Sequence, residues 1–152
     1  MPHLITNRRR AYDLLSRSEK AGRHFVWESV NAILYILGGV AFVAGSLFFY
    51  PALAAEENWG VAAFFVGSVL YLVVTGHDAL EVRRYPHVFR RPRRERRLET
   101  LAAASYLAGT VLFLVGSAFF FTFVDLVTPG AWCFVLGSLL FVLGAFVNVL
   151  EV

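Results

Sequence analysis

The chain has 152 residues, of which 58% are hydrophobic and only 16% are charged, with a formal net charge of +3 at pH 7. This balance excludes a typical soluble enzyme, in which about 25% of residues are charged, and it excludes disorder, which requires few apolar and aromatic residues. Asp, Glu, Lys and Arg are absent from four windows, 29–55, 58–77, 100–124 and 126–150. A helix needs about 20 apolar residues to cross a membrane, so each window predicts one crossing.

Residues 1–28 form a basic tail that we expect to lie in the cytoplasm. Its basic residues are Arg8, Arg9, Arg10, Arg17, Lys20 and Arg23. Apolar residues interleaved with them over 8–28 predict an interfacial helix that runs into the first crossing, although residues 1–10 are as readily a disordered tail. No apolar run with a cleavage site precedes the first crossing, so we expect that crossing to serve as a signal-anchor.

Residues 29–80 are predicted to form a first transmembrane hairpin. We place its crossings near 30–50 and 59–77. Pro51 follows the first crossing and cannot continue a helix, because it lacks an N–H. Asn58 precedes the second crossing, and its side-chain oxygen can cap the first turn. The intervening turn is too short to be a domain.

Residues 81–99 form a loop that is rich in arginine. Its basic residues are Arg83, Arg84, Arg90, Arg91, Arg93, Arg94, Arg96 and Arg97. Arginines next to a crossing attract anionic lipid headgroups, and we expect the first six of them to do so. A cytoplasmic protein partner and nucleic acid are weaker alternatives, and we expect no nucleic-acid partner.

Residues 100–152 are predicted to form a second transmembrane hairpin, with crossings near 101–124 and 130–150. Thr128 and Pro129 open its last helix as N-cap and first helical residue. The single cysteine, Cys133, excludes an internal disulfide, and we interpret it as a small packing residue. All 14 basic residues lie in the tail and the central loop, and neither hairpin turn contains one. The positive-inside rule therefore places both termini in the cytoplasm.

The two hairpins are similar in sequence. GGVAFVAGSLFFYP at 38–51 matches GTVLFLVGSAFFFT at 109–122, which is an offset of 71 residues (38 to 109). FFVGSVLYLV at 64–73 matches FVLGSLLFVL at 134–143, where the offset is 70 (64 to 134). Because each unit contains two crossings, both units enter from the same side. The chain is therefore a parallel internal repeat and not an inverted one.

Small residues recur at helical spacing within these units. The glycines are Gly38, Gly45, Gly67, Gly109, Gly116, Gly137 and Gly144. In a membrane, small residues let helices approach closely, so we interpret these positions as packing seams that line the bundle interior, with Phe and Leu facing outward. A pore or ligand wall is the weaker alternative. The hydroxyls of Ser46, Ser68, Ser117 and Ser138 can bond to an i−4 carbonyl or to a neighbouring helix.

The repeat unit resembles a known family. NAILYILGGVAFVAGSLFFYP, an acidic turn and WGVAAFFVGSVLYL are similar to the YrhK-like proteins, small bacterial membrane proteins built on a two-helix unit. The first unit, about 26–85, is the better match. The second, about 101–152, has Thr122 where the first has Pro51. The resemblance implies a tandem duplication and supplies no activity and no catalytic residues.

Polar residues within the crossings are scarce, which argues against catalysis there. Asn31 and Asn148 lie near the cytoplasmic ends of their helices, where both can reach the interface. The best polar cluster is His77, Asp78 and Glu81, on one helical flank, with Glu151 as the counterpart of Glu81. Such residues can bind a divalent metal, but the favoured interpretation is that the acidic groups offset the arginine-rich face. We therefore assign no catalytic, cofactor or metal site.

These observations predict an all-α integral membrane four-helix bundle made of two tandem hairpins. The expected location is the bacterial inner membrane, with several crossings and both termini cytoplasmic. We expect a non-enzymatic, structural or interaction role with self-association. The alternative is a small ion channel or transporter whose path lies between subunits, lined by the Gly/Ser seams and the acidic residues at the cytoplasmic ends. No cofactor is expected.

Overall fold

A computed structural model describes residues 20–84, 93–124 and 126–150 of the chain. Its elements are α2 (Lys20–Phe48), the 3₁₀ helix η1 (Pro51–Glu56), α3 (Glu57–Arg84), α4 (Arg93–Phe119) and α5 (Val127–Val149). The described part of the chain consists of helices joined by turns and contains no strand. Each α-helix holds a stretch long and apolar enough to cross a membrane, namely Ser29–Phe48, Glu57–Arg83, Arg96–Phe119 and Val127–Val149.

The first hairpin turn is a short helix. Pro51 opens η1, with Tyr50 extended at its N-cap. The backbone of Glu57, the residue that follows, is already α-helical, so the chain passes from η1 into α3 without a free helix start. Asn58 therefore lies inside α3, and its predicted capping role is wrong.

The second hairpin turn is longer than predicted. α4 ends at Phe119, five residues before the expected limit at 124, and backbone bonds from Val124 N to Phe121 O (2.8 Å) and from Leu126 N to Phe119 O (3.1 Å) close the turn. α5 begins at Val127 with Leu126 at the N-cap, so Thr128 does not cap it. Pro129 lies in the first turn, where the missing N–H has no intrahelical partner to lose.

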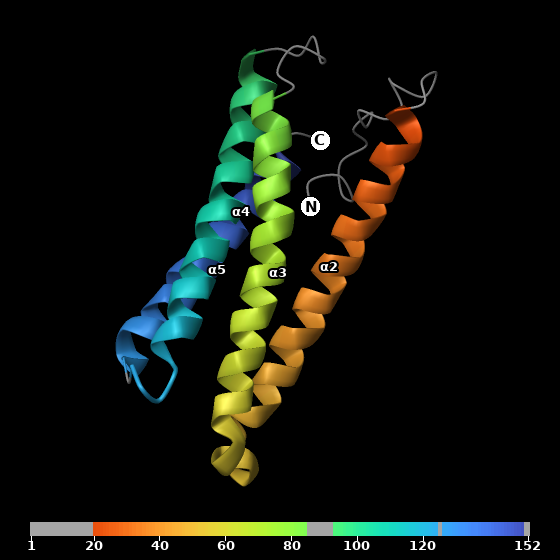
Figure 1. Cartoon of the computed structure of the whole chain (residues 1–152). Helices are drawn as coiled ribbons and strands as arrows, with labels where there is room; N and C mark the ends of the chain where they lie inside the picture. Colours follow the sequence, from red (N-terminus) through yellow and green to blue (C-terminus); the bar gives the residue numbers. More distant parts are fainter. Residues whose placement is uncertain (1–19, 85–92, 125, 151–152) are drawn as a thin grey trace.

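The helices pack in chain order, α2 on α3, α3 on α4 and α4 on α5. Figure 1 shows both hairpin turns at the same end of the molecule, as a parallel repeat requires, with α2 leaning away from α3 toward the opposite end. α3 and α4 therefore join the two units. α2 and α5 are the outer members of the series, and no backbone approach within 8 Å joins them among the described residues.

Phenylalanine rings from all four helices meet between the units. The Phe42 ring centroid lies 5.6 Å from that of Phe64, 5.7 Å from that of Phe113 and 6.4 Å from that of Phe134. Phe113 and Phe134 are 5.3 Å apart. The expectation that Phe faces outward is wrong for these four rings. They point inward because the glycines of the neighbouring helix leave space for them.

Candidate functional site

The two helices of the first hairpin touch at paired glycines. A Cβ placed on Gly38 would lie 3.3 Å from the carbonyl oxygen of Gly67, and a Cβ on Gly67 would lie 3.1 Å from that of Gly38. Closer to the hairpin turn, Gly45 and Gly60 face each other in the same reciprocal way, at 3.0 and 2.9 Å. The two backbones are thus so close that a methyl group at any of these positions meets the opposing backbone.

The second hairpin repeats this arrangement residue for residue. Gly109 pairs with Gly137 (2.9 and 3.0 Å from each Cβ position to the opposing carbonyl oxygen), and Gly116 pairs with Gly130 (3.0 and 3.1 Å). Aromatic rings cover the glycines, since the Cβ position of Gly109 is 2.7 Å from the Phe141 ring. The helix faces that carry these paired glycines are therefore covered by the opposing backbone and by aromatic rings. They leave no free surface that could line a pore.

Two further glycines and the single cysteine have different surroundings. The Cβ position of Gly144 lies 3.0 Å from Tyr106, so this glycine also contacts a ring. Gly76 has no atom within 4 Å of its Cβ position. Cys133 is half-buried, and its Cβ lies 2.9 Å from the Cβ position of Gly116, which places it on the α4–α5 seam.

Hydroxyl groups mark the contact between the two units. Ser68 of α3 and Ser117 of α4 are fully buried, and their Oγ atoms lie 3.4 Å apart. Each also donates to its own helix, to Phe64 O and Phe113 O respectively. Thr75 and Thr110 repeat the contact further along the same two helices, with their Oγ1 atoms 3.3 Å apart.

The other two predicted serines lie on the outer helices. Ser46 donates to Phe42 O (2.8 Å) and is exposed. Ser138 is exposed on α5. The structure thus brings together only one pair of the four predicted serines.

The predicted polar cluster lies near the C-terminal end of α3, away from the hairpin turns. His77, Asp78 and Glu81 each offer a metal-ligand atom, and these atoms lie within 4.8 Å of one another. Asn31 of α2 approaches the ring, with its Nδ2 3.0 Å from His77 Nδ1. The amide nitrogen carries the protons that it can donate to this ring nitrogen. The remaining amide oxygen of Asn31 is buried without a hydrogen-bond partner among the described residues.

Asn148 behaves differently from the prediction. Its side chain is completely buried and donates from Nδ2 to the Tyr106 hydroxyl at 3.2 Å, so the expectation that it reaches the interface is wrong. A tyrosine from α4 covers it, which the sequence around Asn148 does not indicate.

The remaining predicted site residues lie at the ends of the helices or outside the described residues. Arg83 and Arg94 are exposed near the end of α3 and the start of α4, as contact with lipid headgroups requires. Arg84 and Arg93 are helical in backbone. Arg90, Arg91 and Glu151 lie outside the described residues, as does most of the tail.

Sequence reasoning missed the buried threonine pair and the aromatic residues at this end of the bundle. Tyr35 and Tyr71 stack with ring centroids 4.6 Å apart. The repeat offset aligns Tyr35 with Tyr106, and this was the available signal. Thr75 and Thr110 align with Ala145 and Gly39, so no repeat signal exists for them.

Comparison with known proteins supports the repeat. The family model for YrhK-like proteins matches the chain twice, over residues 26–82 and 96–152. Nothing matches among curated proteins or among solved structures. The two matched segments coincide with the α2–α3 and α4–α5 hairpins, and together they cover most of the chain. The chain therefore belongs to the YrhK-like family, as a tandem repeat of its two-helix unit.

Proposed function

We propose that this protein is a non-enzymatic, self-associating protein of the bacterial inner membrane with a structural or interaction role. Its four apolar helices support several crossings. The concentration of basic residues in the tail and the central loop supports an orientation with both termini and residues 81–99 in the cytoplasm. Exposed Arg83 and Arg94 lie where they can contact anionic headgroups on that side.

The observation that carries this proposal is the filled interior. Rings of Phe42, Phe64, Phe113 and Phe134 occupy the space between the helices, and the glycine faces are closed by opposing backbone. Reactive groups inside a membrane are costly and mark function, yet the charged residues of the described helices lie near the helix ends. A chain packed in this way offers surfaces to other helices and not an internal site.

The outer helices offer faces that a second copy of the chain can cover. Large apolar side chains of α2 and α5 are widely exposed, including Val43 (65%), Val142 (65%) and Ile36 (63%). Purification in a mild detergent, followed by determination of the protein mass in the particle, tests the proposal. We expect a mass of at least two chains. Monomers alone, both in detergent and in lipid nanodiscs, would contradict self-association.

A second candidate function, cation binding or transport, is favoured by one observation. The ligand atoms of His77, Asp78 and Glu81 converge within 4.8 Å. A nitrogen ligand and two carboxylates suit a divalent transition-metal ion, and the same groups can collect ions for a path between subunits. The closed glycine seams argue against the path that the sequence suggested, because they offer no lining surface.

Flux into liposomes separates the two functions. If the protein is a transporter, ion flux should be measurable and should fall when Asp78→Asn and Glu81→Gln remove the negative charges. If it is a metal-binding protein, the purified chain should retain metal, and His77→Ala should lose it. The proposed structural role predicts no flux and no difference in metal content between these variants and the parent chain. Flux or metal that depends on these three residues would favour the second candidate.

A further inference from the structure

The contact between the two units shows how one YrhK-like hairpin packs against the next. α3 and α4 meet through the Ser68–Ser117 and Thr75–Thr110 pairs. Phe65 of α3 also lies edge-on to Phe121 in the turn after α4, with ring centroids 6.0 Å apart. The two helices are closely packed, since Val74 is 1% exposed and Ala102 is 0% exposed. This is the chain's own example of an interface between units.

Because of the internal repeat, the outer helices carry residues that correspond to those in the α3–α4 contact. With the offset of 70, Ser68 corresponds to Ser138 of α5, and with the offset of 71, Ser117 corresponds to Ser46 of α2. Ser68 and Ser117 are fully buried, whereas Ser138 and Ser46 are exposed. The outer helices thus present the two halves of an interface that the inner helices bury.

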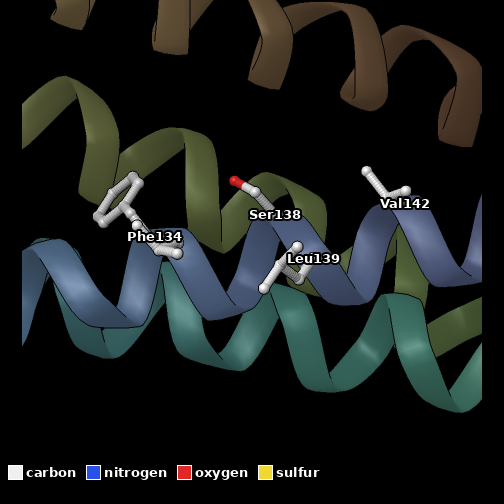
Figure 2. A pocket seen from close by; sticks show the side chains of 5 residues that line it. Phe134, Ser138, Leu139 and Val142 are labelled. Atoms are coloured by element: carbon white, nitrogen blue, oxygen red, sulfur yellow. The ribbon is translucent and has the colours of Figure 1, made fainter.

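The uncovered half on α5 is a groove of about 370 Å³. Figure 2 shows its side chains, with Ser138 and Val142 projecting from α5 on the side of α2. The groove is lined by Phe134, Val135, Ser138, Leu139 and Val142. These align with Phe64, Phe65, Ser68, Val69 and Leu72 of α3. Of that set, Ser68 faces Ser117 of α4, and Phe65 faces Phe121 in the turn after α4.

The uncovered half on α2 carries exposed apolar residues. Ile36 and Val43, which are 63% and 65% exposed, align with Leu107 and Leu114 of α4, both of which are half-buried. At the level of the Thr75–Thr110 pair the outer helices carry Ala145 and Gly39. These smaller side chains permit a closer approach of two helices.

The two halves do not cover each other within one chain. α2 has backbone contacts with α3 and η1 but not with α5 among the described residues, and Figure 1 shows α2 diverging from the other helices toward the end opposite the hairpin turns. The Phe42–Phe134 ring contact at 6.4 Å spans the space inside the bundle. Beyond that contact, Ser138 and Val142 on the same side of α5 stay exposed.

We propose that a second copy of the chain covers these faces, with α5 of one copy packing antiparallel on α2 of the other and repeating the α3–α4 contact. Ser138 of one copy then lies opposite Ser46 of its partner. Such an interface joins two different surfaces, α5 of one copy and α2 of the next. A closed symmetric assembly therefore uses the α2 and the α5 of each copy once and forms a ring. The smallest such ring is a dimer. A lipid chain can fill the groove but cannot match the serine hydroxyls. This inference rests on the proposed self-association and names its surface.

Cysteine cross-linking in membranes tests this proposal. In a Cys133→Ala background, Ser46→Cys and Ser138→Cys are placed on two chains with different tags, which are expressed together and oxidised. We expect a cross-linked species of twice the chain mass that carries both tags. The matched control pairs Ser46→Cys with Leu136→Cys, because Leu136 aligns with Val66, which stays exposed on α3 at 53%. This control should give no such species.

Further variants keep the proposal falsifiable. Ser68→Cys with Ser117→Cys in one chain should form an internal disulfide, which verifies oxidation at a known contact. Ser138→Trp should lower the particle mass to that of one chain, whereas Leu136→Trp should not.

Three outcomes would count against the proposal in different ways. When Ser46→Cys and Ser138→Cys are combined in a single chain, an internal disulfide between these two positions would show that the chain closes on itself and would overturn the proposal. A multimeric particle that lacks the cross-link between positions 46 and 138 and tolerates Ser138→Trp would overturn this surface only. Monomers of the parent chain would overturn self-association itself.

Discussion

Gly109→Ala is the sharpest test of the close helix contact. The new methyl carbon would lie 2.9 Å from the Gly137 carbonyl oxygen and 2.7 Å from Phe141 Cδ2. The ring can turn, but the oxygen belongs to the backbone of α5. The two helices must therefore separate by a few tenths of an ångström along the seam.

The magnitude follows from two opposing effects. Alanine is favoured over glycine in a helix interior by about 1 kcal/mol, while inserting a methyl group into a tight contact costs about 1–3 kcal/mol. Gly76→Ala is the matched control, because no atom lies within 4 Å of its Cβ position. The propensity gain cancels in the comparison, so the free energy of unfolding should be about 1–3 kcal/mol lower for Gly109→Ala than for Gly76→Ala.

Reversible unfolding in mixed micelles, titrated with SDS and followed by circular dichroism, measures this difference. We expect Gly76→Ala to equal or exceed the parent chain in stability and Gly109→Ala to be less stable than Gly76→Ala. If the two variants are equally stable, the helices are not in backbone contact at this glycine, and the explanation of the repeated seams is refuted.

Two further predictions concern the aromatic interior and the buried amide. Phe42→Ala should lower the free energy of unfolding by less than the roughly 3–5 kcal/mol of a ring deletion in a water-soluble core, because in lipid only the packing part is lost. Phe123→Ala, at a ring 84% exposed, should leave it unchanged in the same titration. Tyr106→Phe removes the acceptor of the Asn148 amide and should cost about 0.5–1.5 kcal/mol. Tyr50→Phe, at a residue 70% exposed, should be neutral, and equal losses in the two tyrosine variants would contradict the buried bond.

The sequence was sufficient to predict four apolar helices and the repeat, because charge-free windows and Gly-Ser spacing are local properties. It did not predict the bounds of the helices, since α3 runs to Arg84 and α4 begins at Arg93, both inside the predicted loop 81–99. Contacts between helices were harder to predict. Asn148 looks like an interfacial residue near a helix end, and only the Tyr106 ring from α4 makes it buried. The inward turn of Phe42 depends on the glycines of the opposite helix, which hydropathy does not reveal.

In the candidate site, too, the local pattern could be predicted from the sequence and the contacts between helices could not. His77, Asp78 and Glu81 were found from their spacing on one helix, whereas the approach of Asn31 required the packing of α2 on α3. The Thr75–Thr110 contact joins residues that do not correspond in the repeat, so no alignment of the units indicates it. Exposed Ser46 and Ser138 look the same in sequence as buried Ser68 and Ser117, because the repeat preserves the residue but not its neighbour.

The central claim is that two hairpins enter the membrane from the cytoplasmic side, and site-directed labelling tests it most directly. In a Cys133→Ala background, single cysteines are placed at exposed Ala55 and Thr128 in the hairpin turns and at exposed Thr100 beside the arginine-rich loop. A membrane-impermeant maleimide applied to spheroplasts should label positions 55 and 128, and position 100 only after the membrane is opened. Labelling of 55 and 128 from opposite sides, or of 100 from outside, would contradict the account.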